Sequence, residues 1–203
     1  MKESITIMTT DIRIDPAVRQ KRMEQMQELY DLALANNDMC KEELYTLIKK
    51  ITNENKQEIE NQAIDYIYTA LEQVMVITLQ EARKIYKKLK DNKRISIEEL
   101  FYKADEKTLD ERVRERIEQD WDTLTLLYYL GVILDTETFQ IIHQTIKSKV
   151  NIDYIEIVGA GCENCTNVGE ITPADEAVLP PYHPNCCCQA IGYTKEDVLQ
   201  DII

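Results

Sequence analysis

The stretch KQEIENQAIDYIYTALEQVMVITLQEARKIYKKLKD, residues 56–91, decides the fold class of this chain. It contains neither glycine nor proline, and its apolar residues recur at intervals of three and four positions, as on one face of an α-helix. A helix over the whole stretch is roughly 50 Å long at about 1.5 Å of rise per residue. Amphipathic helices of this length are typical of bundles or of interaction surfaces, so the sequence predicts a mainly α fold, a helical bundle with one long helix.

The segments on either side also show helical periodicity. Asp15 and Pro16 form a start signal, with Asp as the N-cap and Pro in the first turn, for a helix that we expect to stop at Asn36-Asn37-Asp38. Gly131 is expected to end or kink a later helix. Further helices are predicted over Met39–Ile51, from Asp105 or Thr108 to Leu130, and from Asp135 or Thr136 to about Val150. An apolar group around the lone tryptophan is assigned to the core: Trp121, Leu124, Tyr128 and Leu130.

The pattern changes after Asn151. Residues 153–158 (DYIEIV) alternate polar and apolar residues, and residues 189–193 (QAIGY) resemble a returning strand. Thr194 and Asp197 fit a capping box for a last short helix over residues 195–202. The sequence therefore predicts a helical domain over residues 1–150 and a small β-hairpin element with a short terminal helix over residues 151–203.

Composition limits the possible function classes. An apolar fraction of 44% and a charged fraction of 30% are ordinary for a globular protein. The net charge of −13 disfavours direct nucleic-acid binding, because non-specific affinity for the phosphate backbone comes from cationic side chains. No apolar run is long enough for a membrane span, and the N-terminus lacks a signal-peptide pattern. We expect a chain that stays in the reducing cytoplasm where it is made, and there clustered cysteines favour metal binding.

The metal-capable residues are concentrated in GAGCENCTNVGEITPADEAVLPPYHPNCCCQA, residues 159–190, which holds five of the six cysteines. Zinc prefers four cysteine or histidine ligands, usually supplied as two chelating pairs, and glycines such as Gly159 and Gly169 give such turns backbone freedom. We predict a structural zinc site, and its candidate ligands are Cys162, Cys165, His183, Cys186 and Cys188. Cys186 and Cys188 compete for one place; spacing favours Cys186, and Cys187 is expected to face away from whichever neighbour binds.

Other interpretations of these cysteines stay open. They include buried free thiols, a disulfide and an iron–sulfur cluster. A catalytic zinc keeps an open ligand position and needs a general base, but the only histidine besides His183 is His143, which the sequence places in a helix as an ordinary residue. Cys40 stands alone and is interpreted as a packed cysteine rather than a reactive thiol.

The arrangement Cys162-Glu-Asn-Cys165 followed by Leu179-Pro-Pro-Tyr-His183-Pro-Asn-Cys186-Cys-Cys188 resembles the C-terminal signature of the phage Mu-type minor head (head morphogenesis) protein family. The family usually has arginine where this chain has Cys187, and an Asp-x-Arg approach where this chain has Gly159-Ala-Gly161. The resemblance implies a helical domain that ends in a small cysteine–histidine element and lies beside the portal protein in tailed phages and prophages.

The resemblance gives the functional expectation. The chain is expected to be a structural minor head protein that binds Zn²⁺, contacts the portal or major capsid protein, and resides in the virion after synthesis in the host cytoplasm. We expect no catalytic residues and no membrane association. Two alternatives stay open: a small phage-type zinc nuclease or toxin-like effector, and a host-interaction or regulatory protein that reuses the same fold.

Overall fold

The computed structural model describes residues 12–87, 89–90, 95–102, 107–119, 121–159, 165 and 168–199. Within this part of the chain it is mainly helical, with a small antiparallel sheet near the C-terminus, which confirms the predicted fold class. The helices are α1 (Pro16–Ile48), α2 (Lys56–Tyr86), α3 (Leu109–Glu118) and α4 (Thr123–Lys149). Short 3-10 turns, η1 (Ile97–Glu99) and η2 (Lys195–Asp197), complete the helical elements.

The helices begin where side chains satisfy their first backbone N–H groups. Asp15 Oδ1 accepts hydrogen bonds from Ala17 N at 2.8 Å and Val18 N at 3.2 Å, which confirms the predicted start of α1. Thr108 and Glu111 form a reciprocal capping box at the start of α3. Of the two predicted starting residues, Asp105 and Thr108, the structure therefore selects Thr108.

The predicted break at Asn36-Asn37-Asp38 is wrong, because α1 continues through it. Asparagine disfavours helix interiors partly because its side chain competes for nearby backbone groups. Here distant groups occupy both amides: Asn37 Nδ2 donates to Asp135 Oδ1 and to Thr138 Oγ1, each at 2.9 Å. Asn36 Nδ2 donates to the carbonyl oxygen of Ala70 at 3.0 Å. These tertiary contacts outweigh the local preference, and two predicted helices merge into α1.

The predicted break at Gly131 is also wrong. The chain leaves the helical conformation after α3, and Asp122 then caps α4 by accepting from Leu124 N at 3.0 Å and Thr125 N at 3.1 Å. From there α4 runs through Gly131 and through Asp135, which was a predicted helix start. A Cβ at Gly131 would lie 3.4 Å from Lys41 Cε, an ordinary contact distance, so this position inside α4 does not require glycine.

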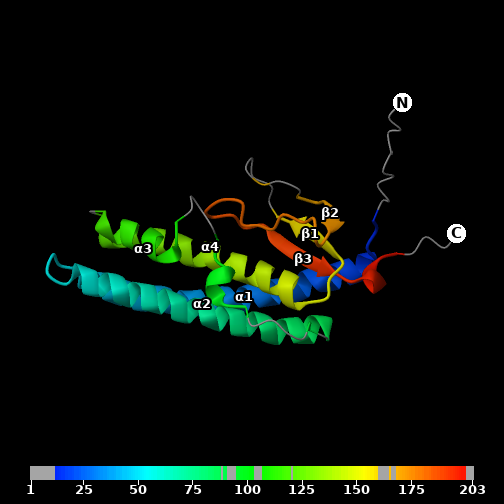
Figure 1. Cartoon of the computed structure of the whole chain (residues 1–203), viewed down its shortest axis with the longest axis horizontal. Helices are drawn as coiled ribbons and strands as arrows, with labels where there is room; N and C mark the ends of the chain where they lie inside the picture. Colours follow the sequence, from blue (N-terminus) through cyan, green and yellow to red (C-terminus); the bar gives the residue numbers. More distant parts are fainter. Residues whose placement is uncertain are drawn as a thin grey trace, which may run out of the picture.

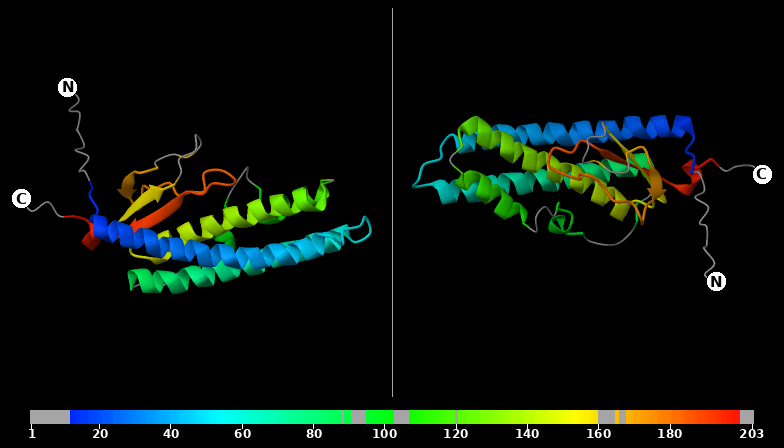
Figure 2. Two further views of the ribbon diagram at one scale, coloured as in Figure 1. Left: turned by 180° about the vertical axis from the view of Figure 1, so that it is seen from behind. Right: turned by 90° about the horizontal axis from the view of Figure 1, so that it is seen from above.

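Three long helices form the bundle, where the sequence predicted one. Figures 1 and 2 show α1 and α2 side by side, with α4 packed along both and α3 beside α2 and α4. Fully buried side chains from these helices fill the centre: Met26, Leu29, Tyr30, Leu44, Ile67, Leu71, Leu109, Leu130, Leu134, Ile141 and Ile142. At about 1.5–3 kcal/mol for each buried large apolar side chain, this layer is the main source of the bundle's stability. No described helix combines the length and apolar character needed to cross a lipid bilayer.

The aromatic group at the start of α4 was assigned wrongly to the core. Leu130 is fully buried, but Leu124 is 67% exposed, Tyr128 59% and Trp121 37%. The buried positions of α4 include Leu126, Leu130 and Leu134, and at about 100° per residue Leu124 and Tyr128 fall on the opposite face. Trp121 precedes the helix and packs on the Tyr129 ring, with ring centroids 4.9 Å apart.

The sheet has the strand order β2-β1-β3 and is antiparallel throughout. Its strands are β1 (Tyr154–Val158), β2 (Ile171–Pro173) and β3 (Gln189–Tyr193). The predicted strands over residues 153–158 and 189–193 correspond to β1 and β3, which pair from Tyr154 opposite Tyr193 to Val158 opposite Gln189. The sequence missed β2, so the expected hairpin is a three-stranded sheet with β1 in the centre.

The sheet lies over one side of the bundle, against α1 and α4 (Figures 1 and 2). Tyr86, at the end of α2, donates from its hydroxyl to the Gly192 carbonyl at 3.0 Å. A Cβ on Gly192 would lie 2.8 Å from Ile152 Cγ2, so only glycine allows Ile152 to pack this closely against β3. After β3 the Thr194–Asp197 capping box forms as predicted but encloses the three-residue η2; the end of the predicted helix lies outside the described residues.

Candidate metal centre

Three of the predicted ligands meet beside β3. The sulfurs of Cys165, Cys186 and Cys188 all lie within 4.8 Å of one another, and the Cys165 and Cys186 sulfurs are 3.8 Å apart. Cys188 immediately precedes β3, while Cys165 comes from the segment between β1 and β2. Together these thiols could hold a metal ion. The fold thus brings Cys165 next to Cys186, although the two residues are 21 positions apart in the chain.

Both residues that competed for one ligand place lie in the cluster. Cys186 and Cys188 are buried, whereas Cys187 between them is exposed. The alternation expected of an emerging strand is therefore present, and it turns both Cys186 and Cys188 toward Cys165. Selecting one of the two by knuckle spacing was unnecessary, because the fold presents both sulfurs.

Two glycines shape the approach to this cluster. A Cβ on Gly159 would lie 2.7 Å from Cys188 Sγ and 3.1 Å from its Cα, so the end of β1 must be glycine for the Cys188 sulfur to reach the cluster. Gly169 has φ of +85°, a conformation that other residues rarely adopt, and it follows the Cys165 segment into β2. Gly169 adopts a positive φ, consistent with the backbone freedom predicted for a glycine here, whereas Gly159 leaves room for the Cys188 side chain.

His183 approaches the cluster from the Cys165 side. Its Nε2 is 3.4 Å from Cys165 Sγ, and its Nδ1 is 2.7 Å from the carbonyl oxygen of Pro184. A carbonyl oxygen can only accept, so Nδ1 carries the proton in this contact and the lone pair of a neutral ring lies on Nε2. This is the tautomer that metal-binding histidines use when the second ring nitrogen donates to a backbone carbonyl. The remaining candidate, Cys162, lies outside the described residues.

The thiols differ in their surroundings. Burial raises the pKa of Cys188, so without a cation this sulfur stays protonated, whereas a coordinating metal ion stabilises the thiolate. Cys40, far from the cluster in α1, is buried near the Tyr66 carbonyl oxygen at 3.6 Å, and burial raises its pKa to about 12. Cys40 is therefore a packed, unreactive thiol, as the sequence indicated.

His143 fixes the loop before Cys186 to the bundle, a role that the sequence did not indicate. Its ring is buried; Nδ1 donates to the Pro180 carbonyl at 2.6 Å, and Nε2 accepts from Ala190 N at 3.2 Å and from the Tyr30 hydroxyl. These partners belong to α1, the loop before His183, and β3. Burial lowers the pKa of His143 to about 4, so the ring is neutral at pH 7. The surrounding isoleucines gave no signal of these distant partners.

Glu156 provides a second buried polar link. This residue of β1 is 2% exposed, and its carboxylate accepts from Arg19 Nε at 3.0 Å and from the Tyr193 hydroxyl at 2.8 Å. Arg19 lies in α1, so the ion pair joins the sheet to the bundle. The alternating pattern of residues 153–158 placed Glu156 on one face of a strand, but no local feature indicated its partner.

Comparisons with known proteins found no relative of this chain. No protein-family model matches the chain, and no curated protein or solved structure gives a significant match. The features of this chain that bear on function are its own residues, above all the three thiols that the fold brings together.

Proposed function

We propose that this chain is a structural protein whose C-terminal sheet is stabilised by zinc, and that it serves as a minor head protein of a phage or prophage. The observation that carries the metal proposal is the convergence of Cys165, Cys186 and Cys188 beside β3. The head-protein role is supported by the resemblance of the segment from Leu179 to Cys188 to the Mu-type minor head signature.

The donor atoms suit tetrahedral zinc. With bonds of about 2.3 Å to sulfur and about 2.0–2.1 Å to nitrogen, neighbouring ligand atoms lie roughly 3.5–3.8 Å apart. The Cys165–Cys186 sulfur distance of 3.8 Å and the Cys165 sulfur to His183 nitrogen distance of 3.4 Å agree with this spacing. We propose Cys165, Cys186 and Cys188 as three of the ligands, with His183 or Cys162 as the fourth.

A set of four protein ligands makes the site structural. A catalytic zinc leaves a position for water, whereas a closed site contributes to folding. The C-terminal segment is too short to build a large apolar core of its own, and a zinc ion compensates for that. The nuclease alternative needs a histidine to activate water, but both ring nitrogens of His143 are engaged by Pro180, Ala190 and Tyr30.

Metal content tests the zinc proposal. We expect about one zinc ion per chain by plasma mass spectrometry in protein purified under reducing conditions, and loss of that zinc in Cys165→Ser and Cys186→Ser. Cys187→Ser is the matched control, since this neighbouring thiol is exposed and should leave the zinc in place. Zinc-free wild-type protein, or equal loss of zinc in the control, contradicts the assignment. Iron with sulfide instead of zinc identifies a cluster.

A second experiment tests the head-protein role separately. We expect the chain to co-migrate in gel filtration with the portal or major capsid protein encoded beside its own gene. We also expect to detect it by mass spectrometry in purified virions. Its absence from virions together with failure to co-migrate excludes the role while leaving the zinc site intact, and redirects attention to the host-interaction alternative.

A further inference from the structure

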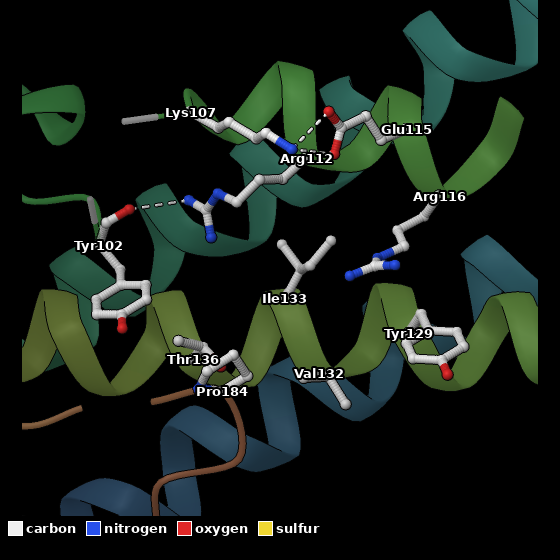
Figure 3. A pocket seen from close by; sticks show the side chains of 10 residues that line it. All are labelled: Tyr102, Lys107, Arg112, Glu115, Arg116, Tyr129, Val132, Ile133, Thr136 and Pro184. Atoms are coloured by element: carbon white, nitrogen blue, oxygen red, sulfur yellow. Dashed lines mark hydrogen bonds and ion pairs between the residues drawn. The ribbon is translucent and has the colours of Figure 1, made fainter. Parts of the chain in front are cut away.

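A cavity of about 130 Å³ lies between α3 and α4, and Pro184, from the loop that carries Cys186, lines its edge (Figure 3). A single water needs about 10–15 Å³ on this scale, so the cavity has room for a small molecule. The charged residues in its wall are Lys107, Arg112, Arg116 and Glu115. Three cations and one carboxylate line this cavity, although the chain as a whole carries a net charge of −13.

Arg112 is held rigidly at the cavity wall. One terminal nitrogen donates to the Tyr102 carbonyl at 3.1 Å and forms an ion pair with Glu137, which is fully buried. Glu137 also accepts from Tyr102 N at 2.8 Å. These contacts engage one edge of the guanidinium, and Nε of Arg112 is buried with no hydrogen-bond partner in the described part of the chain.

A second donor without a partner stands opposite Arg112. The Thr136 hydroxyl, on α4, is buried and makes no hydrogen bond to any residue that the structure describes. Thr136 as a whole is 5% exposed. Buried polar groups in proteins are nearly always hydrogen-bonded, so two unpartnered donors in one cavity wall indicate a missing acceptor.

Arg116 supplies the charge. Its guanidinium lies 4.9 Å from the centre of the Tyr129 ring and, in Figure 3, extends from α3 toward the space above Ile133. Among the described residues it has no carboxylate within ion-pair distance, because the neighbouring Glu115 pairs with Lys107 at 2.7 Å. Within the described part of the chain, the contact of the Arg116 guanidinium with the Tyr129 ring is therefore not accompanied by an ion pair.

We propose that this cavity binds the oxyanion group, phosphate or carboxylate, of a small molecule. Arg116 contributes the charge-assisted contact, and the Thr136 hydroxyl and Arg112 Nε donate hydrogen bonds to the oxygens. Val132, Ile133 and Pro184 line the same cavity and contact the apolar part of the ligand. The small volume of the cavity and the net charge of −13 on the chain favour a small anion over a nucleic-acid backbone. None of the three donors belongs to the zinc ligand set, so the proposal does not depend on the metal.

Calorimetric titration of the full chain tests this site, with inorganic phosphate and acetate as separate probes in buffer of low ionic strength. We expect saturable binding of at least one probe with a Kd of about 1 mM or lower. Arg116→Gln should weaken that binding about tenfold or more, because a bidentate, charged donor is lost. Thr136→Val should weaken it less, and circular dichroism should show that both variants fold.

Arg83→Gln is the matched control, since it makes the same charge change at an exposed position of α2. Binding of phosphate alone or of acetate alone supports the site and identifies its oxyanion. Absence of saturable binding of either probe overturns the proposal. So does equal weakening in Arg83→Gln, because the attraction would then be a property of net charge and not of the cavity.

Discussion

The bundle and the sheet are stabilised by different kinds of contact. In the bundle, α1, α2 and α4 bury an extended apolar layer, and many similar side chains share the free energy of folding. The sheet has short strands that add fewer apolar side chains to the same core, among them Ile155, Ile157 and Ile191, and single polar contacts fasten it to the bundle: those of His143 and the Glu156–Arg19 pair. The bundle should therefore tolerate the loss of any single apolar contact. The sheet should be more sensitive to the loss of one of its few polar contacts.

Removing the proposed zinc ligands should give the largest effect and should affect the two regions unequally. In Cys165→Ser we expect backbone amides of β1 and β3 to lose protection from hydrogen exchange, because the loops flanking both strands meet at this cluster. Amides at the centres of α1 and α2 should keep theirs. Exchange followed by mass spectrometry on peptides of the folded protein measures both, with Cys187→Ser as control. Equal loss throughout the chain contradicts a local role for the metal.

The next effect compares buried ion pairs in the two regions. Arg112→Ala leaves the fully buried Glu137 without its charge partner, and we expect the free energy of unfolding to fall by about 3–5 kcal/mol. Arg19→Ala should cost less, since the Arg19 side chain is 44% exposed and water screens its pair with Glu156. Urea denaturation gives both values.

Lys84→Ala provides the baseline for these two variants, because its pair with Glu81 lies on the surface of α2 and Lys84 is 70% exposed. We expect a change below about 1 kcal/mol. The interpretation of Glu137 as a buried charge is wrong if Arg112→Ala costs no more than Lys84→Ala.

His143 should make the joint between bundle and sheet sensitive to acid. Its pKa is about 4 in the folded chain and about 6.5 when unfolded, so between these values only the unfolded state binds the proton. Stability is therefore fully present above about pH 6.5 and falls as the pH drops toward 4, at up to about 1.4 kcal/mol per pH unit. Between pH 6.5 and pH 5 the contribution lost is about 1.5 kcal/mol.

Urea denaturation at both pH values, with His143→Gln alongside, isolates this contribution. The variant lacks a titrating ring at this position, so its stability should decrease less than that of the wild type over the same interval. All other groups titrate in both proteins and cancel in the difference. Identical pH dependence in the two proteins contradicts a buried neutral His143.

Periodic patterns of apolar residues predicted helices and strands, whereas individual long-range contacts could not be predicted from the sequence. The periodic apolar positions of residues 56–91 predicted α2, which ends at Tyr86 and not at Asp91, and the alternation of residues 153–158 predicted β1. The helix break at Asn37 was wrong because its contact with Asp135, far along the chain, overrides local preference. The break at Gly131 was wrong because one glycine inside a helix costs only about 1 kcal/mol, which the packing of α4 outweighs. The site follows the same rule: residue type and spacing found the thiols, but the partners of His143 exist only in the folded chain.

The smallest expected effect tests where the bundle ends. The sequence placed Leu124 and Leu130 in one core, whereas the structure exposes 67% of Leu124 and buries Leu130 completely. Leu130→Ala should lower the free energy of unfolding by about 2–5 kcal/mol, because it opens a cavity among packed side chains. Leu124→Ser should change it by less than about 0.5 kcal/mol, since a surface side chain has few contacts to lose. Thermal unfolding of the two variants measures the contrast. A large loss in Leu124→Ser would show that α4 buries this face against another part of the molecule, and the core would then extend to the start of α4.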